Sequence, residues 1–470
     1  MRNLVVIVAD TLRTLESIDS LVLGRDAPFL DNLIRASTTF DRAVSSSPWT
    51  IPSHWSLLCG ANPWEVGGGY PTRPAAHRRA SVARFCGESR GTSFALSQNG
   101  MIGGESGPMF DYDFSIGNHA FGVNRIGAEI SSVMDLALGV SARKLQEMSA
   151  ADHSARVARD PPELFRATLS KAAQTVALVT HGIRMSHLGL HRLCALLEEE
   201  RSSRPTHIFL NLMDVHEPYI RAPALRGTML EGGCVPTTNL AIHSDSLRNS
   251  GVCPKAFHDA YRHAIGNLDK SLRNVFGVLE KGRILDDALV CLVSDHGQSL
   301  GENGFFGHSW SLYDEVVRIP AYLWSSGRQH CDKGTSRIRD WVDHRHLHSV
   351  LLDQAAEPAK RVELSIREAL DRHGPAISYF RGRRLSGFNP ARRLPSYERI
   401  RLWQNDSNLE LYRGGSNSSI QQLTPNSRNS PALESAANRV LQETRLAADE
   451  LEVAGECSEF PSKLASWGYA

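Results

Sequence analysis

Three apolar runs in this chain each stop on an aspartate. They cover residues 4–9 before Asp10, 207–213 before Asp214, and 288–294 before Asp295. In an open parallel sheet, ligands bind beyond the carboxyl ends of the strands, so carboxylates that are far apart in the sequence can meet in one crevice. The pattern therefore predicts an α/β fold in which three acidic side chains approach one another.

Between these runs, apolar residues recur with helical spacing. Residues 28–34 begin with a proline suited to a first helical turn, and residues 256–280 carry a long amphipathic pattern before the Asp295 run. Residues 321–324 indicate a further strand, and 342–352 the next helix. This alternation predicts a mostly parallel central sheet flanked by helices, as in α/β domains.

Past residue 376 the composition shifts toward Arg, Ser, Asn and Pro. Short strand candidates follow at 377–381, 399–403 and 409–412, and then a helix at 432–453. These elements predict a small C-terminal antiparallel α+β subdomain.

The same shift suggests how the chain is divided. We expect a catalytic domain over 1–375 and a C-terminal subdomain with its terminal helix over 376–470. Within the first, residues 111–205 have an irregular helical pattern and contain no motif that indicates chemistry. We expect this segment to be an insertion that shapes the substrate pocket.

Composition narrows the functional classes. The hydrophobic fraction of 41% and the charged fraction of 22% are ordinary for a soluble globular protein. A net charge of +1 gives no general attraction to nucleic acid or anionic lipid, so neither partner is expected. No window approaches the roughly 20 apolar residues of a membrane span. The first predicted strand leaves no room for a leader, so we expect a cytoplasmic location. Nothing in the sequence indicates the oligomeric state.

The strand-end residues could hold a cation. Asp10, Asp295 and His296 would supply two carboxylates and one imidazole and leave a coordination position open, which is typical of a catalytic metal site. Oxygen and nitrogen ligands suit Zn²⁺, Mn²⁺, Mg²⁺ or Ca²⁺, so a divalent metal ion of unspecified identity is the expected cofactor.

Thr50 is the candidate nucleophile and a further metal ligand. It precedes a predicted short helix, with Pro52 near the first turn and Gly60 at the end. Coordination to a divalent cation and the positive end of a helix dipole both favour an alkoxide and the anion that it attacks. Both effects require the fold to bring position 50 to the strand ends.

A second acid and imidazole pair leaves two interpretations open. Asp214 and His216 could ligate a second ion about 4 Å from the first. Alternatively, His216 could contact the transferring group while Asp214 supports it. His308 presents the same choice, and we favour substrate contact, and hence a catalytic role, for both histidines.

Each of these residues also has an ordinary structural interpretation. An aspartate at a strand end is commonly a helix cap or a turn former. A lone histidine is usually a satisfied polar residue, and a threonine near a proline is most often part of a plain loop. The functional interpretation rests on the coincidence of acid, imidazole and hydroxyl groups in four separate segments.

Taken together, the motifs resemble the alkaline phosphatase and sulfatase superfamily, in particular its sulfatase-like branch. The matching segments are VIVADTLR at 6–13, FDRA at 40–43, WTIPSH at 49–54, MDVHEPY at 213–219, SDHG at 294–297, GH at 307–308, RLW at 401–403 and ELY at 410–412. The resemblance spans most of the chain and is weakest over 111–205 and after 415. It implies an alkaline phosphatase-like fold.

The chain departs from the sulfatase pattern at the nucleophile. In the sulfatases that the chain resembles, the nucleophile motif is Cys/Ser-x-Pro-Ser-Arg, and its first residue is oxidised to formylglycine. This chain has Thr50 at that first position and His54 in place of the arginine. Threonine cannot yield that aldehyde. The second aspartate of many sulfatases is also replaced, here by Thr11. Threonine at the nucleophile position resembles instead the phosphodiesterases, phosphonate-cleaving enzymes and phosphotransferases of the superfamily.

The sequence therefore predicts a metal-dependent hydrolase or phosphotransferase that cleaves a phosphate diester, monoester or phosphonate through a covalent Thr50 intermediate. Its partner would be a small-molecule phosphate or sulfate ester. One alternative is a sulfuric ester hydrolase that acts without formylglycine. Another is a non-catalytic binding protein of the same fold.

Overall fold

The computed structural model describes residues 2–14, 24–66, 92–97, 99, 119–122, 197, 205–216, 242–243, 254–302, 305–308, 311–326, 336–383, 396–414, 420–422 and 431–453. Most of the predicted insertion over 111–205 lies outside these residues. Among the described helices, none combines the length and the apolar character needed to cross a membrane.

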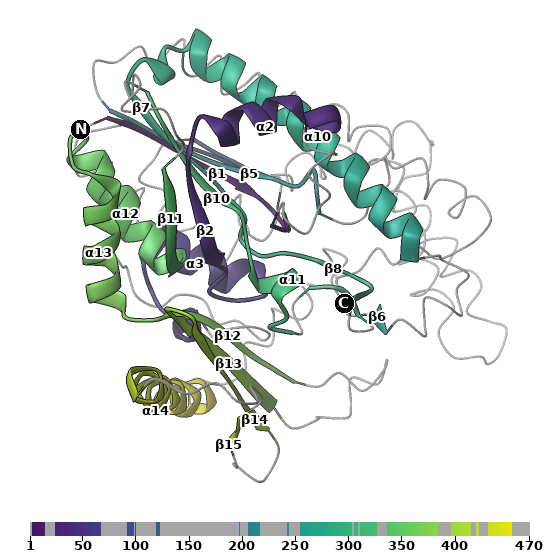
Figure 1. Cartoon of the computed structure of the whole chain (residues 1–470), viewed down its shortest axis with the longest axis vertical. Helices are drawn as coiled ribbons and strands as arrows, with labels where there is room; N and C mark the ends of the chain where they lie inside the picture. The colour runs from purple at the N-terminus through teal and green to yellow at the C-terminus, as the bar shows by residue number, and fades with distance from the viewer. Residues whose placement is uncertain are drawn as a thin grey trace, which may run out of the picture.

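An eight-stranded sheet forms the centre of the fold, with the strand order β11-β2-β10-β7-β1-β5-β3-β4 (Figure 1). Its strands are β1 (Asn3–Ala9), β2 (Thr38–Val44), β3 (Thr92–Ser97), β4 (His119–Gly122), β5 (Thr206–Leu212), β7 (Ala288–Val293), β10 (Ala321–Ser325) and β11 (Arg337–Asp343). Only β10 runs antiparallel to its neighbours. The prediction of a mostly parallel central sheet is confirmed.

The three strands that end before aspartates are adjacent in this sheet. Strand β1 pairs with β5 on one side and with β7 on the other, both in parallel. Ala9 is in register with Leu212, and Val8 with Val293. The carboxyl ends of β1, β5 and β7 therefore reach the same edge of the sheet within one or two residues of one another.

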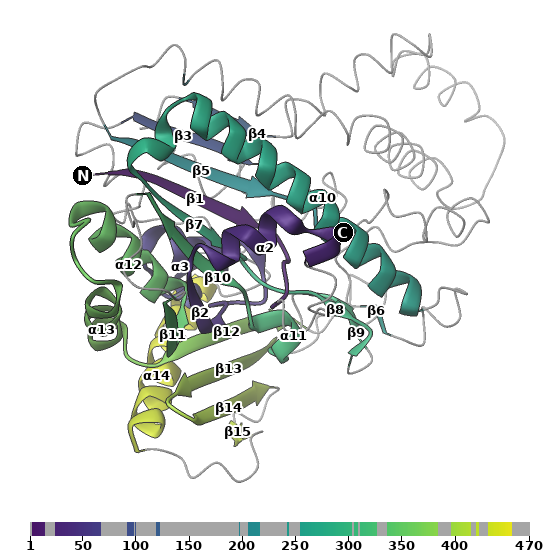
Figure 2. The ribbon, with the colours of Figure 1, turned by 45° about the horizontal axis from the view of Figure 1, so that its top comes forward.

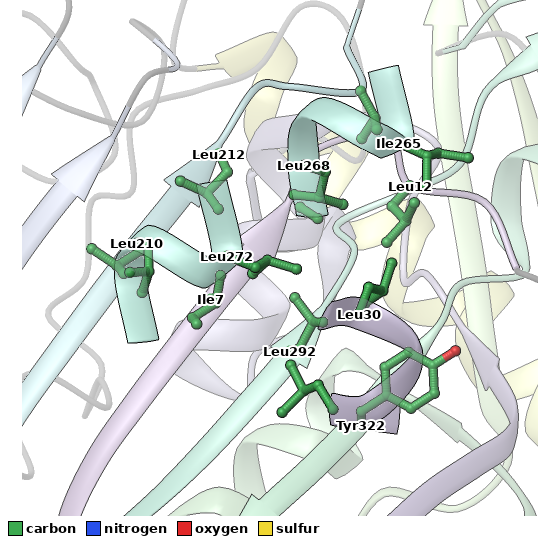
Figure 3. Close-up of a cluster of buried hydrophobic side chains, with 14 of the residues drawn as sticks. Ile7, Leu12, Leu30, Leu210, Leu212, Ile265, Leu268, Leu272, Leu292 and Tyr322 are labelled. Atoms are coloured by element: carbon green, nitrogen blue, oxygen red, sulfur yellow. The ribbon is translucent and has the colours of Figure 1, made fainter. Parts of the chain in front are cut away.

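One face of the sheet is covered by helices α2 (Pro28–Arg35) and α10 (Pro254–Lys281) (Figures 1 and 2). Side chains alternate along each strand, so every second residue of a central strand points toward this layer. The resulting apolar cluster joins Ile7 of β1 and Leu292 of β7 to Leu272 of α10 (Figure 3).

Helices α3 (Thr50–Cys59), α12 (His344–Ala356) and α13 (Val362–His373) cover the other face. The alternate residues of β1, such as Val6, pack there with Leu57 of α3 and Leu347 of α12. Each central strand is therefore buried on both sides, which explains the almost continuous apolar runs in the sequence.

A second sheet follows the central one, with the order β12-β13-β14-β15 and antiparallel pairing throughout (Figure 2). Its strands are β12 (Ala376–Arg383), β13 (Ser396–Gln404), β14 (Ser407–Gly414) and β15 (Ile420–Gln422), and helix α14 (Pro431–Val453) packs on it. The predicted C-terminal antiparallel subdomain is confirmed as an architecture, whereas the domain boundary after residue 375 stays a prediction.

The remaining elements are short. They are β6 (Ile242–His243), β8 (Ser299–Leu300) and β9 (Phe305–Gly307), which form a three-stranded antiparallel sheet, the helix α11 (Asp314–Val317), and the 3-10 turns η2 (Pro63–Val66) and η3 (Ile284–Asp287). The hairpin of β8 and β9 carries the chain from the end of β7 toward His308.

Helix α12 begins two residues later than the pattern over 342–352 predicted. Strand β11 continues through Asp343, which caps the helix: its Oδ1 accepts a hydrogen bond from the Arg345 N–H at 2.8 Å. His346 Nδ1 accepts in return from the Asp343 N–H at 3.1 Å. This reciprocal cap fixes where the strand stops and the helix starts.

Candidate active site

The fold brings four of the predicted site residues together. Asp10 follows β1, Thr50 is the first residue of α3, and Asp295 and His296 follow β7. One carboxylate oxygen of Asp10, one of Asp295 and one ring nitrogen of His296 lie within 4.8 Å of one another. Thr50 Oγ1 lies 3.2 Å from His296 Nε2. All four side chains are buried.

Two amide side chains orient the carboxylate of Asp10. Its Oδ2 accepts hydrogen bonds from Asn99 Nδ2 at 2.9 Å and from Asn211 Nδ2 at 3.3 Å. Its Oδ1 has no hydrogen-bond partner among the described residues, and His216 Nε2 lies 4.0 Å from it. Burial by itself would raise the pKa of Asp10, but His216, His296 and the other nearby polar groups bring this pKa below its usual value.

Asp295 is held by backbone donors. Its Oδ1 accepts from the N–H groups of Thr11 at 3.1 Å and His296 at 2.8 Å, while its Oδ2 has no hydrogen-bond partner within the described part of the chain. Burial, together with the charge of Asp10, raises the pKa of Asp295 well above its usual value. Each carboxylate thus has one oxygen fixed by the protein and one oxygen left for another partner.

Thr11 occupies the position of the second aspartate of many sulfatases, but its side chain has a different role. Thr11 Oγ1 donates to the Val215 carbonyl at 2.9 Å and thereby links the loops after β1 and β5. Its backbone has φ = 63°, in the left-handed region, which turns its N–H toward Asp295. The backbone therefore turns at Thr11, and the Thr11 N–H holds the carboxylate of Asp295 in place.

The tautomer of His296 follows from its neighbours. Its Nδ1 lies 3.0 Å from the Gly297 carbonyl, which can only accept, so Nδ1 carries the hydrogen. The lone pair is then on Nε2, which faces Thr50 Oγ1 at 3.2 Å and Asp295 Oδ2 at 3.3 Å. Burial lowers the pKa of His296 to about 4, so this nitrogen is available at neutral pH.

His54 lies one turn after Thr50 on α3 and is buried beside both carboxylates. Its Nδ1–H donates to the Thr50 carbonyl at 2.8 Å and lies 3.6 Å from Asp295 Oδ2. Its Nε2 is 3.3 Å from Asn211 Nδ2, the amide that also donates to Asp10. Because burial lowers the pKa of His54 to about 4, this residue is a neutral imidazole where the sulfatase pattern has an arginine cation.

His216 and His308 also reach the site. The ring centroid of His308 is 4.4 Å from that of His296 and 5.1 Å from that of His216. His308 Nδ1 is 2.8 Å from Gln298 Oε1, which fixes its hydrogen on Nδ1. Burial, with smaller effects of His296 and His216, lowers the pKa of His308 well below its usual value. The predicted histidines His216 and His308 are therefore gathered beside His296 as buried imidazoles.

Asp214 has a different environment from the other strand-end acids. Its Oδ1 accepts from Ser271 Oγ on α10 at 3.1 Å, and the ligand group found among the described residues does not include it. The end of strand β5 and the loop after it instead contribute Asn211 and His216 to the site. A second-ion or supporting role for Asp214 stays a prediction.

The donor set fits a divalent cation. Two buried carboxylate oxygens, Asp10 Oδ1 and Asp295 Oδ2, have no protein donor among the described residues, and they lie beside an imidazole lone pair on His296. Buried acceptors of this kind are costly unless they are paired. Two carboxylates, one imidazole and an adjacent hydroxyl are ligands that zinc and manganese accept in catalytic sites.

Gly297 allows the metal-site loop to pass close to α11. A Cβ at this position would lie 2.2 Å from the backbone oxygen of Glu315. We expect Gly297→Ala to destabilise the protein by about 1–3 kcal/mol or more, because backbone atoms would have to shift. The matched control is Gly277→Ala in α10, where nothing lies within 4 Å of the added methyl group. That change should stabilise by up to about 1 kcal/mol. Urea denaturation measures both, and equal stability of the two variants would contradict the argument.

The comparisons with known proteins agree with this geometry. The family model described as Sulfatase matches residues 188–355. No curated protein matches the chain by sequence. A phosphonate monoester hydrolase of Agrobacterium radiobacter has a similar structure, with a TM-score of 0.55, 12% identity and coverage of 95% of each chain.

Two further structures extend the comparison. The phosphonate monoester hydrolase from Silicibacter pomeroyi gives a TM-score of 0.54 at 15% identity, with 96% of each chain covered. A 2-O GAG sulfatase, BT1596, gives a TM-score of 0.54 at 13% identity, with 98% of this chain and 94% of that chain covered. The chain therefore shares the fold of these sulfatase-like enzymes, and its residues 188–355 match the Sulfatase model. At these identities the likeness establishes the fold, and the chemistry must be argued from the residues.

Several residues of this site were not singled out from the sequence. Asn99 and Asn211, which orient Asp10, are the clearest cases. Asn211 carried a signal, because an amide inside the apolar run 207–213 interrupts a strand that is buried on both faces. Asn99 carried none, since an asparagine after a short strand usually marks a turn.

Proposed function

We propose that this protein is a divalent-metal-dependent phosphoester hydrolase or phosphotransferase that acts through a covalent intermediate on Thr50. The observation that carries the proposal is the position of Thr50 Oγ1, 3.2 Å from His296 Nε2 and next to the paired carboxylates of Asp10 and Asp295. A buried hydroxyl beside an unprotonated ring nitrogen and two carboxylates that could hold a cation is an arrangement suited to nucleophilic catalysis.

The superfamily fold and the match to the Sulfatase model point to a hydrolase or a transferase. The residue at the nucleophile position favours phosphorus over sulfur. Sulfate ester cleavage by the formylglycine route requires an aldehyde hydrate, which Thr50 cannot form. A threonine hydroxyl can attack phosphorus directly, and phosphonate monoester hydrolases are among the structures with this fold.

The residues that would hold the cation are Asp10, Asp295 and His296, with Thr50 beside them. When bound, the cation supplies charge neutralisation for the two carboxylates and Lewis acid polarisation of the hydroxyl and of a substrate oxygen. Thr50 is also the first residue of α3, whose amino-terminal dipole favours an anionic group at that point.

In the first half-reaction, Thr50 Oγ1 forms a bond to phosphorus and the bond between phosphorus and the leaving oxygen breaks. The hydroxyl gives its proton to an imidazole of the site, and we assign His308 and His216 to this exchange and to contacts with the transferring group. The proton then passes to the leaving oxygen. In the second half-reaction, the oxygen of water or of an acceptor alcohol forms a bond to the same phosphorus and the bond between phosphorus and Thr50 Oγ1 breaks. The proton of the attacking group passes through an imidazole of the site to Oγ1 and restores the threonine hydroxyl.

A substrate panel tests the proposal. Protein loaded with Zn²⁺ or Mn²⁺ would be assayed on an aryl phosphate monoester, a phosphate diester, a phosphonate monoester and an aryl sulfate. We expect metal-dependent turnover of at least one phosphorus ester, and a phosphoryl group on the peptide that contains Thr50 after acid quench. Turnover of the sulfate alone would favour the sulfatase alternative. Full metal loading with no turnover would favour a binding protein.

A further inference from the structure

The candidate site depends on two loops that come from distant parts of the chain. Residues 45–49, after β2, lead into Thr50, and residues 294–296, after β7, carry Asp295 and His296. Neither loop belongs to a regular element. A hydroxyl and a ligand set on separate loops keep a distance of a few ångströms only if something holds the loops together.

His344 contacts both loops. It is the first residue of α12 and is fully buried. Its Nε2 lies 2.9 Å from the Ser294 carbonyl, which can only accept, so Nε2 carries the hydrogen. Its Nδ1 then has the lone pair and accepts from the Ser46 N–H at 3.3 Å. Both ring nitrogens are thus used, one on each loop.

Ser45 makes a second link between the same loops. Its hydroxyl is hydrogen-bonded to the carbonyl of Asp295 and to that of Ser47, and it is fully buried. The Ser47 N–H returns a hydrogen bond to Ser45 Oγ at 3.2 Å. One hydroxyl therefore ties the turn that precedes Thr50 to the backbone of a carboxylate residue of the cluster.

The position of His344 is itself fixed. The preceding residue, Asp343, caps α12, accepts a hydrogen bond from the Ile377 N–H at 2.8 Å and is paired with Arg345 at 2.6 Å. Burial lowers the pKa of His344 to about 4, so the ring is neutral and keeps one donor and one acceptor at neutral pH. The neutral ring therefore matches the Ser46 N–H, which donates to it, and the Ser294 carbonyl, which accepts from it.

We propose that His344 and Ser45 are positioning residues that brace the Thr50 loop against the Asp295 loop and thereby set both the cation affinity and the reach of the Thr50 hydroxyl. This inference rests on the proposed function for the identity of the cation site and of the nucleophile. Neither residue touches the reacting atoms. Both act through the backbone of the two loops that carry Thr50, Asp295 and His296, as outer hydrogen-bond partners act on metal ligands.

Three substitutions at His344 distinguish a positioning role of its hydrogen bonds from a role in ordinary packing. His344→Leu removes donor and acceptor, His344→Asn keeps polar groups near the Nδ1 position, and His344→Gln keeps them near the Nε2 position. The matched control is His348→Leu, one turn further along α12. His348 is also a buried imidazole, and its Nδ1 contacts the Leu57 carbonyl, which belongs to neither loop.

The first readout is binding of Zn²⁺ or Mn²⁺ alone to the metal-free protein, followed by kcat and KM on the best substrate of the panel. We expect His344→Leu to weaken cation binding by about 10–100-fold, the usual effect of losing an outer partner of a metal ligand. The Asn and Gln variants should each recover part of that loss. His348→Leu should lower thermal stability to a similar extent while its cation affinity stays at the wild-type value.

Wild-type affinity in His344→Leu would overturn the proposal, as would Asn and Gln variants no better than Leu, or an equal loss in His348→Leu. Should His344→Leu fail to fold, Ser45→Ala removes the second link with a smaller change. Unchanged affinity and kcat in Ser45→Ala would then overturn it. A wild-type protein that binds the cation but turns over no substrate would refute the proposed function and leave the affinity test of the brace intact.

Discussion

Thr50→Ala is expected to lower kcat by about 10⁴-fold or more and to leave divalent cation binding largely intact. Removal of a nucleophile in covalent catalysis has effects of this size. The carboxylates of Asp10 and Asp295 and the His296 nitrogen do not depend on the hydroxyl for their positions, because Asn99, Asn211 and backbone N–H groups hold the two carboxylates. Activity assays together with metal analysis of the purified variant measure both parts.

Two control variants test whether the loss of activity is specific to the Thr50 hydroxyl. Thr50→Ser retains a hydroxyl and should retain measurable turnover with a phosphoryl adduct at the same position. Ser56→Ala lies on the same helix and removes a buried hydroxyl that has no hydrogen-bond partner among the described residues. That variant should keep full activity. Near-normal kcat in Thr50→Ala would show that no covalent intermediate forms on this residue.

Asp295→Asn is expected to abolish both cation binding and turnover. Asp295 contributes one of the two carboxylate oxygens of the ligand group formed with Asp10 and His296, and the amide of asparagine offers a neutral and weaker ligand. The matched control is Asp214→Asn, the same change at the neighbouring strand end, where the carboxylate contacts Ser271. Metal content after dialysis should fall only in the first variant. Equal loss in Asp214→Asn would support the second-ion interpretation of that residue.

The raised pKa of Asp295 gives this binding a defined pH dependence. Above that pKa both carboxylates are ionised and the cation displaces no proton. Below it the cation must displace one proton, so affinity should fall by about tenfold per pH unit. His296, with a pKa of about 4, adds a second proton only near that pH. Titrations with Zn²⁺ across pH would reveal the slope, and a flat profile would contradict the carboxylate pairing.

The raised pKa of Asp295 also makes the stability of the metal-free protein depend on pH, in the opposite direction to the cation affinity. Because the pKa of Asp295 is raised in the folded state, its contribution to stability is fully present below the unfolded pKa and is lost as pH rises through the folded value. Asp10 has a lowered pKa, so its contribution is present above its unfolded value and is lost as pH falls through the folded one. Added cation should remove the loss on the alkaline side.

Strong periodic features were predictable from the sequence. The apolar runs before Asp10 and Asp295 indicated strands buried on both faces, and parallel strands end at a common edge. The convergence of Asp10, Asp295 and His296 was expected from that geometry, whereas the approach of Thr50 depended on where the fold places position 50. The helix from Thr50 was also indicated, by Pro52 and Gly60.

The supporting residues were not predictable in the same way. His344 lies inside a run of histidines at the start of α12, and no local pattern distinguishes a ring that bridges two loops from one that caps a helix, as His346 does. Asp214 shows the converse. It directly follows an apolar strand, as Asp10 and Asp295 do, but its carboxylate accepts a hydrogen bond from Ser271 on α10. Side-chain direction after a strand depends on the loop conformation, which short motifs do not determine.

The central position of β1 has a consequence for exchange of the cation. β1, β5 and β7 are mutually adjacent and covered by helices on both faces, so their amide hydrogens should be replaced by deuterium only on global unfolding. Local opening is left to the segments beyond the strand ends. A cation held at that edge would therefore leave through loop fluctuations, on a timescale independent of the unfolding rate of the domain.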